Sequence, residues 1–371
     1  MGKAERLELI KKIEKLRDSK VITYVTSDRQ NLDCPIEEND LRELYEHIRR
    51  VPGGKKIDLF LYSLGGDATV GWALANLIKE HTDKFDVLVP FKCFSCATSI
   101  SLGANKIIMH KAGILGPVDP FVANDFNPKV DNVTKPISVE DVGGYLDLIR
   151  DKFDIKDQAN VIQGFNALSN VVNPLALGNV YRHYLKSRED AKKLLELHLD
   201  SKTDKEKIDK IIRTLVETLR YHGHHINRKE AKSIGLDIEF AEDFSNSENN
   251  LADLMWALLN DYENDLELKK PYEDNLPVSG TKNKMPLKFI ESSSLSSIRF
   301  LEREFIDLKF PEDAKVVWLN GLHSVYLPQK FIKDNPTGPV IIPAETITFQ
   351  YIPIKIGDKI YERKDSIYWE N

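Results

Sequence analysis

The chain has 371 residues, 42% of them hydrophobic and 30% charged, which is the composition of a soluble globular protein with room for two or three domains. The formal net charge of −6 excludes a strongly basic surface, so nucleic acid is not expected as a partner. No run of ~18 apolar residues predicts a membrane span, and residues 1–20 have the pattern of a charged helix, not of a signal peptide. Three cysteines are too few for a disulfide framework, and we therefore expect a cytoplasmic protein.

Residues 20–112 alternate between strand and helix patterns. The β-branched run KVITYVTS is typical of a strand, and ENDLRELYEHIRRV places apolar residues at helical spacing. Strands are expected at 20–27, within 53–67, at 84–94 and at 105–112, and helices at 38–51, 67–82 and 95–104. This order predicts a parallel α/β unit.

The second half of the chain is expected to be helical first and β-rich later. Gly, Pro, Asn and Asp gather at 112–136, which predicts a long loop, and helical patterns dominate 138–222. Gly235 is expected to end a short helix, and residues 249–268 form another amphipathic helix pattern. The expected domains are 1–240 with 138–222 as a helical insertion, a helical connector at 241–271, and a small β-rich domain at 285–371 after a linker at 272–284.

Cys93 and Cys96 have the CxxC spacing of redox pairs, and three interpretations are open. A reactive thiolate is plausible at the start of a helix. A structural zinc would need about two more ligands, and no second CxxC or CxxH exists. The third interpretation, which we favour, is that these are small, semi-buried residues that pack a helix.

Gly65 and Gly66 follow a buried strand and precede a helix. Open α/β sheets bind ligands at the carboxyl ends of their strands, where backbone N–H groups can point into a crevice. The next glycine is Gly71, so the GxGxxG spacing of a dinucleotide site is missing. The pair therefore predicts either a plain strand-to-helix turn or a cradle for an anion.

Ser95 repeats this placement one strand later. A serine at the first turn of a helix can be simply an N-cap. A hydroxyl at one strand end and free N–H groups at the neighbouring strand end are also the parts of an acyl-transfer site. In that second interpretation, the N–H of Cys96 would be an oxyanion donor.

Roughly residues 6–240 resemble the serine dehydrogenase proteinase family, in the superfamily of signal peptide peptidase A and the Clp proteolytic subunit. The resemblance rests on five stretches in the same chain order: LRDSKVITYVTS, KIDLFLYSLGGDATVGWALANLI, VPFKCFSCATSISLGANKIIM, ILGPVDP and INRKEAKSIGL. It implies an α/β fold of the crotonase-like (Clp protease) kind, a spiral of ββα units. It also implies peptide hydrolysis without a metal or other cofactor, in a homo-oligomer.

The resemblance assigns roles to three residues and marks two departures. Ser95 becomes the nucleophile, and the amides of Gly66 and Cys96 become the oxyanion donors. Leu64 stands where the family has proline, and Ala97 stands where it has glycine. Both departures are compatible with activity, but together they leave room for a protein that has lost it.

A serine hydroxyl needs a general base, either a histidine or a lysine. The stretch PLALGNVYRHYLKSRED resembles the helix that carries a basic residue in the family, and His183 and Lys186 lie one turn apart on it. His110 follows the last strand of the α/β unit and is another candidate base. Asp119 in GPVDP is a candidate to orient the base, although a carboxylate in such a turn commonly bonds its own backbone.

The cluster HGHHIN contains His222, His224 and His225. It has the composition of a loop and few carboxylates nearby, so a metal site there is a weak alternative.

These observations predict a serine endopeptidase that cleaves peptides or unfolded protein segments through an acyl-enzyme at Ser95. Extended substrates are expected to pair with the strand at Ser63, Leu64 and Gly65. Two alternatives remain. The first is a non-catalytic oligomeric scaffold or binding protein that keeps the fold without the base. The second is a crotonase-type acyl-thioester enzyme that uses the same oxyanion cradle.

Overall fold

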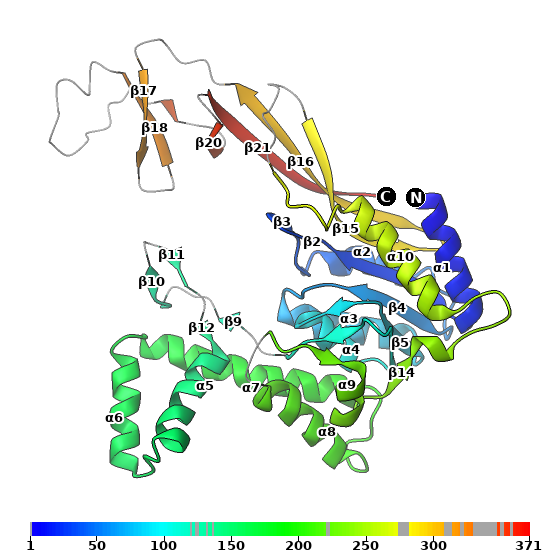
Figure 1. Ribbon diagram of the computed structural model, residues 1–371, viewed down its shortest axis with the longest axis horizontal. Coiled ribbons are helices and arrows are strands. Elements are labelled where there is room, and N and C mark those ends of the chain that lie inside the picture. The colour runs from blue at the N-terminus through cyan, green and yellow to red at the C-terminus, as the bar shows by residue number, and fades with distance from the viewer. Residues whose placement is uncertain are drawn as a thin grey trace. The chain divides into compact units, whose positions relative to one another are not determined.

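Figure 1 shows a computed structural model of the chain. It describes all residues except 1, 119–120, 123–125, 131–132, 136, 220–222, 274–281, 308–313, 320–322, 329–346, 349–351 and 357–358. The chain divides into two compact units. The first contains residues 1–270, 288–297 and 371, and the second contains residues 271–287 and 298–370. These limits differ from the predicted domains, because residues 241–270 and 288–297 lie in the first unit.

The first unit is built on a parallel sheet, as the alternation of strand and helix patterns predicts. Its strands are β1 (Lys20–Thr26), β4 (Ile57–Tyr62), β5 (Phe85–Val89), β7 (Lys106–Met109) and β14 (Ile238–Phe240), in the order β14-β7-β5-β4-β1. Strands β4 and β5 are buried along their whole length, which explains why they are apolar except for Asp58 and Asp86, and both of these carboxylates pair with Arg17. β15 (Lys282–Ser292) pairs antiparallel with β1 through residues 288–292. The α/β class is therefore confirmed.

Helices cover both faces of this sheet. Neighbouring residues of a strand point to opposite faces, and Thr23 bonds Tyr262 while Tyr24 bonds Asp40. Tyr262 belongs to α10 (Leu251–Asp265), which packs on α1 (Lys3–Arg17). Asp40 begins α2 (Asp40–Ile48), which packs on α3 (Ala68–His81), and α3 packs on α4 (Cys96–Leu102). Thus α1 and α10 lie on one face, and α2, α3 and α4 lie on the other.

A second, three-stranded sheet lies beyond the carboxyl ends of the main strands. It contains β6 (Lys92–Cys93), β8 (Ile114–Leu115) and β13 (Ile226–Asn227) in the order β13-β8-β6. The loop predicted at 112–136 therefore contains β8 and, further on, the two-residue strands β9 (Phe121–Val122), β10 (Lys129–Val130) and β11 (Val133–Thr134). β10 and β11 pair with each other, whereas β8 pairs with β13, more than 100 residues later, and a two-residue stretch does not encode such a distant partner.

The region predicted to be helical is helical in the structure. It contains α5 (Val139–Asp147), the helical turn η1 (Leu148–Lys152), α6 (Gln158–Ser169), α7 (Pro174–Glu196), α8 (Lys205–Ile212) and the turn η2 (Arg213–Thr218). After β13, α9 (Arg228–Ile234) ends at Gly235, whose φ of 121° explains the glycine expected at that place. In the part of the chain that the structure describes, no helix is long and apolar enough to cross a membrane.

The second unit is built from antiparallel strands. β16 (Ser296–Asp307), which begins in the first unit, pairs with β21 (Lys359–Glu370), and β21 pairs with β20 (Ile352–Ile356). A separate sheet contains β17 (Ala314–Leu319), β18 (His323–Pro328) and β19 (Ile347–Thr348). The remaining short elements of the chain are β2 (Asp28–Arg29), β3 (Leu32–Asp33), β12 (Ile137–Ser138) and the turn η3 (Ala241–Asp243).

The buried His47 of α2 gives the first unit a predicted pH dependence. Its ring nitrogens lie 3.0 Å from Ser292 Oγ and 3.2 Å from Ser297 Oγ, and burial lowers its pKa from 6.5 to about 4. Between these values the unfolded chain binds a proton that the folded chain does not, so stability falls as the pH falls. From pH 6.5 to pH 4 we expect His47 to contribute a loss of up to about 3 kcal/mol in the free energy of unfolding.

Urea unfolding of the wild type and of His47→Gln at several pH values measures this contribution. The glutamine does not titrate, so the difference between the two proteins should shrink as the pH is lowered. Parallel curves for the two proteins would show that His47 has an ordinary pKa in the folded state.

Candidate active site

Two strand-to-helix turns lie side by side at the carboxyl edge of the main sheet. The first follows β4 and contains Gly65 and Gly66, and the second follows β6 and contains Ser95. Two backbone hydrogen bonds join them, from Ser63 N–H to Lys92 O (3.0 Å) and from Phe94 N–H to Ser63 O (3.0 Å). The structure therefore brings the predicted cradle and the predicted nucleophile together.

The glycines are required by the closeness of these turns. A Cβ on Gly65 would lie 2.8 Å from Ser95 Cβ and 3.2 Å from the amide nitrogen of Cys96. A Cβ on Gly66 would lie 2.2 Å from the carbonyl oxygen of Ile36. Real Cβ atoms essentially never lie within 3.0 Å of another heavy atom in this way, so larger residues would force the turns apart. The Ser63 hydroxyl further fixes the turn, because it accepts a hydrogen bond from Gly65 N–H at 3.0 Å.

Ser95 has the strained backbone of an exposed turn residue. Its φ of 51° and ψ of −118° lie outside the left-handed helical region that Asp18, with φ 48° and ψ 50°, adopts as an ordinary helix cap. Such a conformation costs of order 1–3 kcal/mol in a non-glycine residue and gathers at functional sites. The Ser95 side chain forms no capping hydrogen bond with α4 and is partly exposed. Ser95 thus occupies the N-cap position of α4, but its hydroxyl does not cap the helix.

Two backbone N–H groups beside Ser95 have free hydrogen-bonding capacity. Within the described part of the chain, neither the N–H of Gly66 nor that of Cys96 donates a hydrogen bond. Gly66 is pinned in place because its neighbours bond Ile36, with Ile36 N–H donating to Gly65 O and Asp67 N–H donating to Ile36 O. A hydroxyl and two pre-positioned N–H donors can together stabilise a negatively charged oxygen.

The two cysteines around Ser95 are packing residues in this structure. Both are free thiols and buried, and the Cys93 thiol bonds Ser101 while the Cys96 thiol donates to Asp67 O at 3.0 Å. Burial raises the pKa of Cys93 to about 12 and also raises the pKa of Cys96. A reactive thiolate needs the opposite shift. The redox interpretation of CxxC is therefore not supported.

The predicted bases on α7 are not placed at Ser95. His183 and Lys186 are both exposed on the helix, and the Lys186 ammonium pairs with Asp190 one turn further on. The buried face of α7 is formed by Ala176, Leu177, Val180, Ala191, Leu194 and Leu195. Among the described contacts, neither His183 nor Lys186 touches Ser95.

His110 lies against the opposite face of the sheet. Its ring stacks on Trp256 of α10 with 5.1 Å between centroids, and its Nδ1 accepts a hydrogen bond from Ala112 N–H. Burial lowers the pKa of His110, so the ring is neutral with its proton on Nε2. This placement argues against His110 as the base for Ser95. Asp119, predicted to orient a base, lies outside the described residues.

The predicted substrate strand has much of its backbone already bonded. Both backbone groups of Ser63 bond the β6 turn, and the Gly65 carbonyl accepts from Ile36 N–H at 2.8 Å. Leu64 between them has an exposed side chain. A substrate strand therefore cannot pair with Ser63 and Gly65 in the expected manner without displacing these bonds.

One contact near Ser95 involves a residue that the sequence did not single out as a base. The ring of His225 stacks on the ring of Phe94, with 5.3 Å between centroids and 21° between planes. The neighbouring His224 instead pairs with Glu230 at 2.8 Å. The motif HGHHIN contains both histidines, and the pairing of β13 with β8 brings His225 beside Phe94, the residue before Ser95. Within the described residues, no group of His, Cys, Asp and Glu is placed to hold a metal ion.

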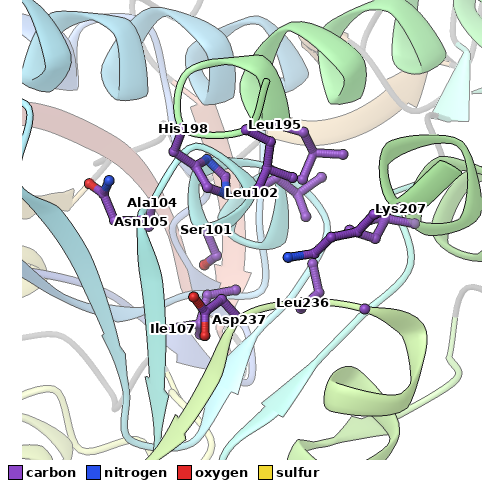
Figure 2. A pocket seen from close by; sticks show the side chains of 13 residues that line it. Ser101, Leu102, Ala104, Asn105, Ile107, Leu195, His198, Lys207, Leu236 and Asp237 are labelled. Atoms are coloured by element: carbon purple, nitrogen blue, oxygen red, sulfur yellow. The ribbon is translucent and has the colours of Figure 1, made fainter. Parts of the chain in front are cut away.

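Two cavities lie away from Ser95. The described residues form a pocket of about 10 Å³ beside α4. Figure 2 shows that His198, Lys207 and Asp237 line it from separate elements. That volume holds about one water molecule, so the pocket cannot hold a substrate. A cavity of about 250 Å³ lies beside α1 and the turn after β15, lined by Leu7, Ile10 and the serines at 292–296. The candidate site is therefore an exposed edge of the sheet and not one of these cavities.

Comparison with known proteins agrees with this geometry. Two uncharacterized proteins of Methanocaldococcus jannaschii are similar to the chain. The first, MJ0137, is 27% identical over 245 residues, which are 63% of this chain and 73% of the relative. The second, MJ1495, is 36% identical over 126 residues, which are 32% of this chain and 42% of the relative. The model of the ClpP-like SDH-type serine proteinases matches residues 2–164, which contain both turns of the site.

Proposed function

We propose that this protein is a serine endopeptidase that cleaves peptides or unfolded protein segments through an acyl-enzyme at Ser95. The observation that carries the proposal is the strained Ser95 turn beside the free N–H groups of Gly66 and Cys96. The match of residues 2–164 to the model of a serine proteinase family supports it. The two relatives are uncharacterized, so the support for the activity comes from the geometry of the site and the family match.

The geometry supports acyl transfer in two steps. The Ser95 oxygen attacks the peptide carbonyl carbon while a base takes its proton, and the carbonyl oxygen becomes an oxyanion held by the N–H groups of Gly66 and Cys96. Collapse of this intermediate breaks the C–N bond, and the protonated base gives its proton to the leaving amine. Water then hydrolyses the ester at Ser95 and restores the enzyme.

A non-catalytic scaffold is the second candidate function. It is favoured by one observation, which is that no described contact joins His183, Lys186 or His110 to Ser95. A protein that kept the cradle and lost the base would have this arrangement. The acyl-thioester alternative gains no comparable support from any described contact.

Covalent labelling separates the two candidates. The purified full-length protein is treated with a fluorophosphonate probe between pH 6 and pH 10, and the modified residue is mapped by mass spectrometry. A peptidase is labelled at Ser95, because the probe reacts with activated serines. A folded protein that takes up no probe across this range would contradict the peptidase proposal and favour the scaffold.

We also propose that the protein is a homo-oligomer, with the helical region from α5 to α7 in the interface. Five large apolar side chains there are more than half exposed: Phe153 (63%), Ile162 (51%), Val171 (77%), Leu175 (61%) and Tyr181 (61%). So many exposed large apolar side chains within residues 153–181 are expected to be covered by a partner chain.

Light scattering after gel filtration tests this proposal. The wild type should have a mass that is a multiple of 42.4 kDa, and the variant carrying Val171→Asp and Leu175→Asp should shift toward the monomer. A monomeric wild type at micromolar concentration would contradict the proposal.

A further inference from the structure

His225 reaches the vicinity of Ser95 through the small sheet. In that sheet Cys93 pairs with Leu115, and Leu115 pairs with Ile226. One residue beyond these pairs, the strands place Phe94, Gly116 and His225 in one row across the sheet. Phe94 is the residue directly before Ser95, so this row ends beside the nucleophile.

Gly116 in the middle of the row makes the contact possible. A Cβ on Gly116 would lie 3.3 Å from both Cβ and Cδ1 of Phe94. Strands two positions apart in a sheet are separated by about 10 Å, yet the rings of Phe94 and His225 are 5.3 Å apart. The two rings therefore meet above a glycine that leaves the space between them open.

His224 and His225 differ in how firmly their side chains are held. His224 is held by Glu230 in a hydrogen bond of 2.8 Å, and the Asn227 side chain fixes that turn by accepting from Glu230 N–H. His225 is exposed, and its only described contact is the stacking on Phe94. An exposed imidazole changes rotamer within nanoseconds, so His225 is free to turn toward a neighbouring hydroxyl.

We propose that His225 is the general base for Ser95, an inference that rests on the proposed peptidase function. In this structure the two side chains form no hydrogen bond, and such bonds commonly tighten only when substrate is bound. A ring nitrogen of His225 accepts the hydroxyl proton as the bond from Ser95 Oγ to the carbonyl carbon forms. The same nitrogen returns that proton to the amine as the C–N bond breaks, so charge and protons balance over the step.

The identity of the general base is left open by His183, Lys186 and His110, and His225 provides a candidate. Those three candidates point into solvent, pair with a carboxylate or stack on the opposite face. His225 is the basic side chain whose described contact is with the residue bonded to Ser95. The base would then come from outside the matched residues 2–164 of the family, on a strand that the fold returns to the site.

The rate of phosphonate labelling at Ser95 tests this inference in the full-length protein. We expect His225→Gln to lower the second-order rate at least about 100-fold, as loss of a general base does. His224→Gln is the matched control, because it changes the adjacent histidine and keeps an amide that can bond Glu230. We expect its rate to stay within about threefold of the wild type, as for other surface changes. His225→Ala should regain labelling when imidazole is added, which a purely structural residue would not do.

The outcomes separate this inference from the proposed function. A wild type that is never labelled contradicts the peptidase proposal itself. Labelling of Ser95 in the wild type at a rate unchanged in His225→Gln overturns the role of His225 and leaves the peptidase proposal standing. An equal loss of rate in His224→Gln, with both variants folded by circular dichroism, also overturns it.

Discussion

Ser95→Ala should lose phosphonate labelling completely and peptide hydrolysis by at least about 10³-fold, because the acyl-enzyme can no longer form. The same change should leave the free energy of unfolding within about 0.5 kcal/mol of the wild type. The reason is that the Ser95 side chain caps no helix and is partly exposed, so its removal breaks no described bond. Peptide cleavage assays and urea unfolding of the same preparations measure both effects.

Ser99→Ala is the matched control for this experiment. Ser99 lies one helical turn after Ser95 in α4, and its hydroxyl makes only a 3.4 Å contact with Ser95 O. Both variants lose one serine hydroxyl from the same helix, but only Ser95 stands beside the N–H groups of the cradle. Equal activity in Ser95→Ala and Ser99→Ala would mean that any hydrolysis arises elsewhere on the molecule.

The parallel strands could be predicted from sequence because each depends on residues close to it in the chain. KVITYVTS predicts residues 20–27, and β1 is Lys20–Thr26. Pairing over long distances could not be predicted in this way. Thr23 of β1 pairs with Glu291 of β15, 268 residues later, and neither stretch of sequence indicates which strand it will pair with. The first unit therefore includes residues that the sequence assigned to a separate C-terminal domain.

In the site, too, residues whose positions depend on nearby sequence could be predicted, and residues placed by long-range pairing could not. Gly65, Gly66 and Ser95 could be found because each follows a strand, and the carboxyl ends of neighbouring parallel strands meet at one edge. The base could not be found from spacing, because β8 and β13 have only two residues each and lie in stretches with loop composition. His183 and Lys186 have the right chemistry at helical spacing, yet the buried face of α7 turns both outward.

Gly66→Ala should destabilise the protein and lower the labelling rate of Ser95 by about 10² to 10³, the loss typical of one oxyanion donor. The new Cβ would lie 2.2 Å from Ile36 O and 2.5 Å from Ile36 N, and both atoms are backbone, which no side-chain rotation can move aside. Ile36 is itself bonded to Gly65 O at 2.8 Å and to Asp67 N at 2.9 Å. Relief of the clash therefore breaks these bonds, with an expected loss of about 1–3 kcal/mol.

Gly178→Ala separates the effect of the cradle from that of adding a methyl group. Gly178 lies inside α7, and a Cβ there meets no atom within 4 Å. Alanine should stabilise that helix by about 0.5–1 kcal/mol and leave labelling unchanged.

If Gly66→Ala is destabilised but its folded fraction reacts at the wild-type rate, the Gly66 N–H is a structural element only. The oxyanion would then depend on Cys96 N–H and a donor not yet assigned, while the role of Ser95 would stand. If folded Gly66→Ala is labelled slowly at Ser95 while Gly178→Ala is labelled at the wild-type rate, the labelling rate depends on the position of the Gly66 N–H.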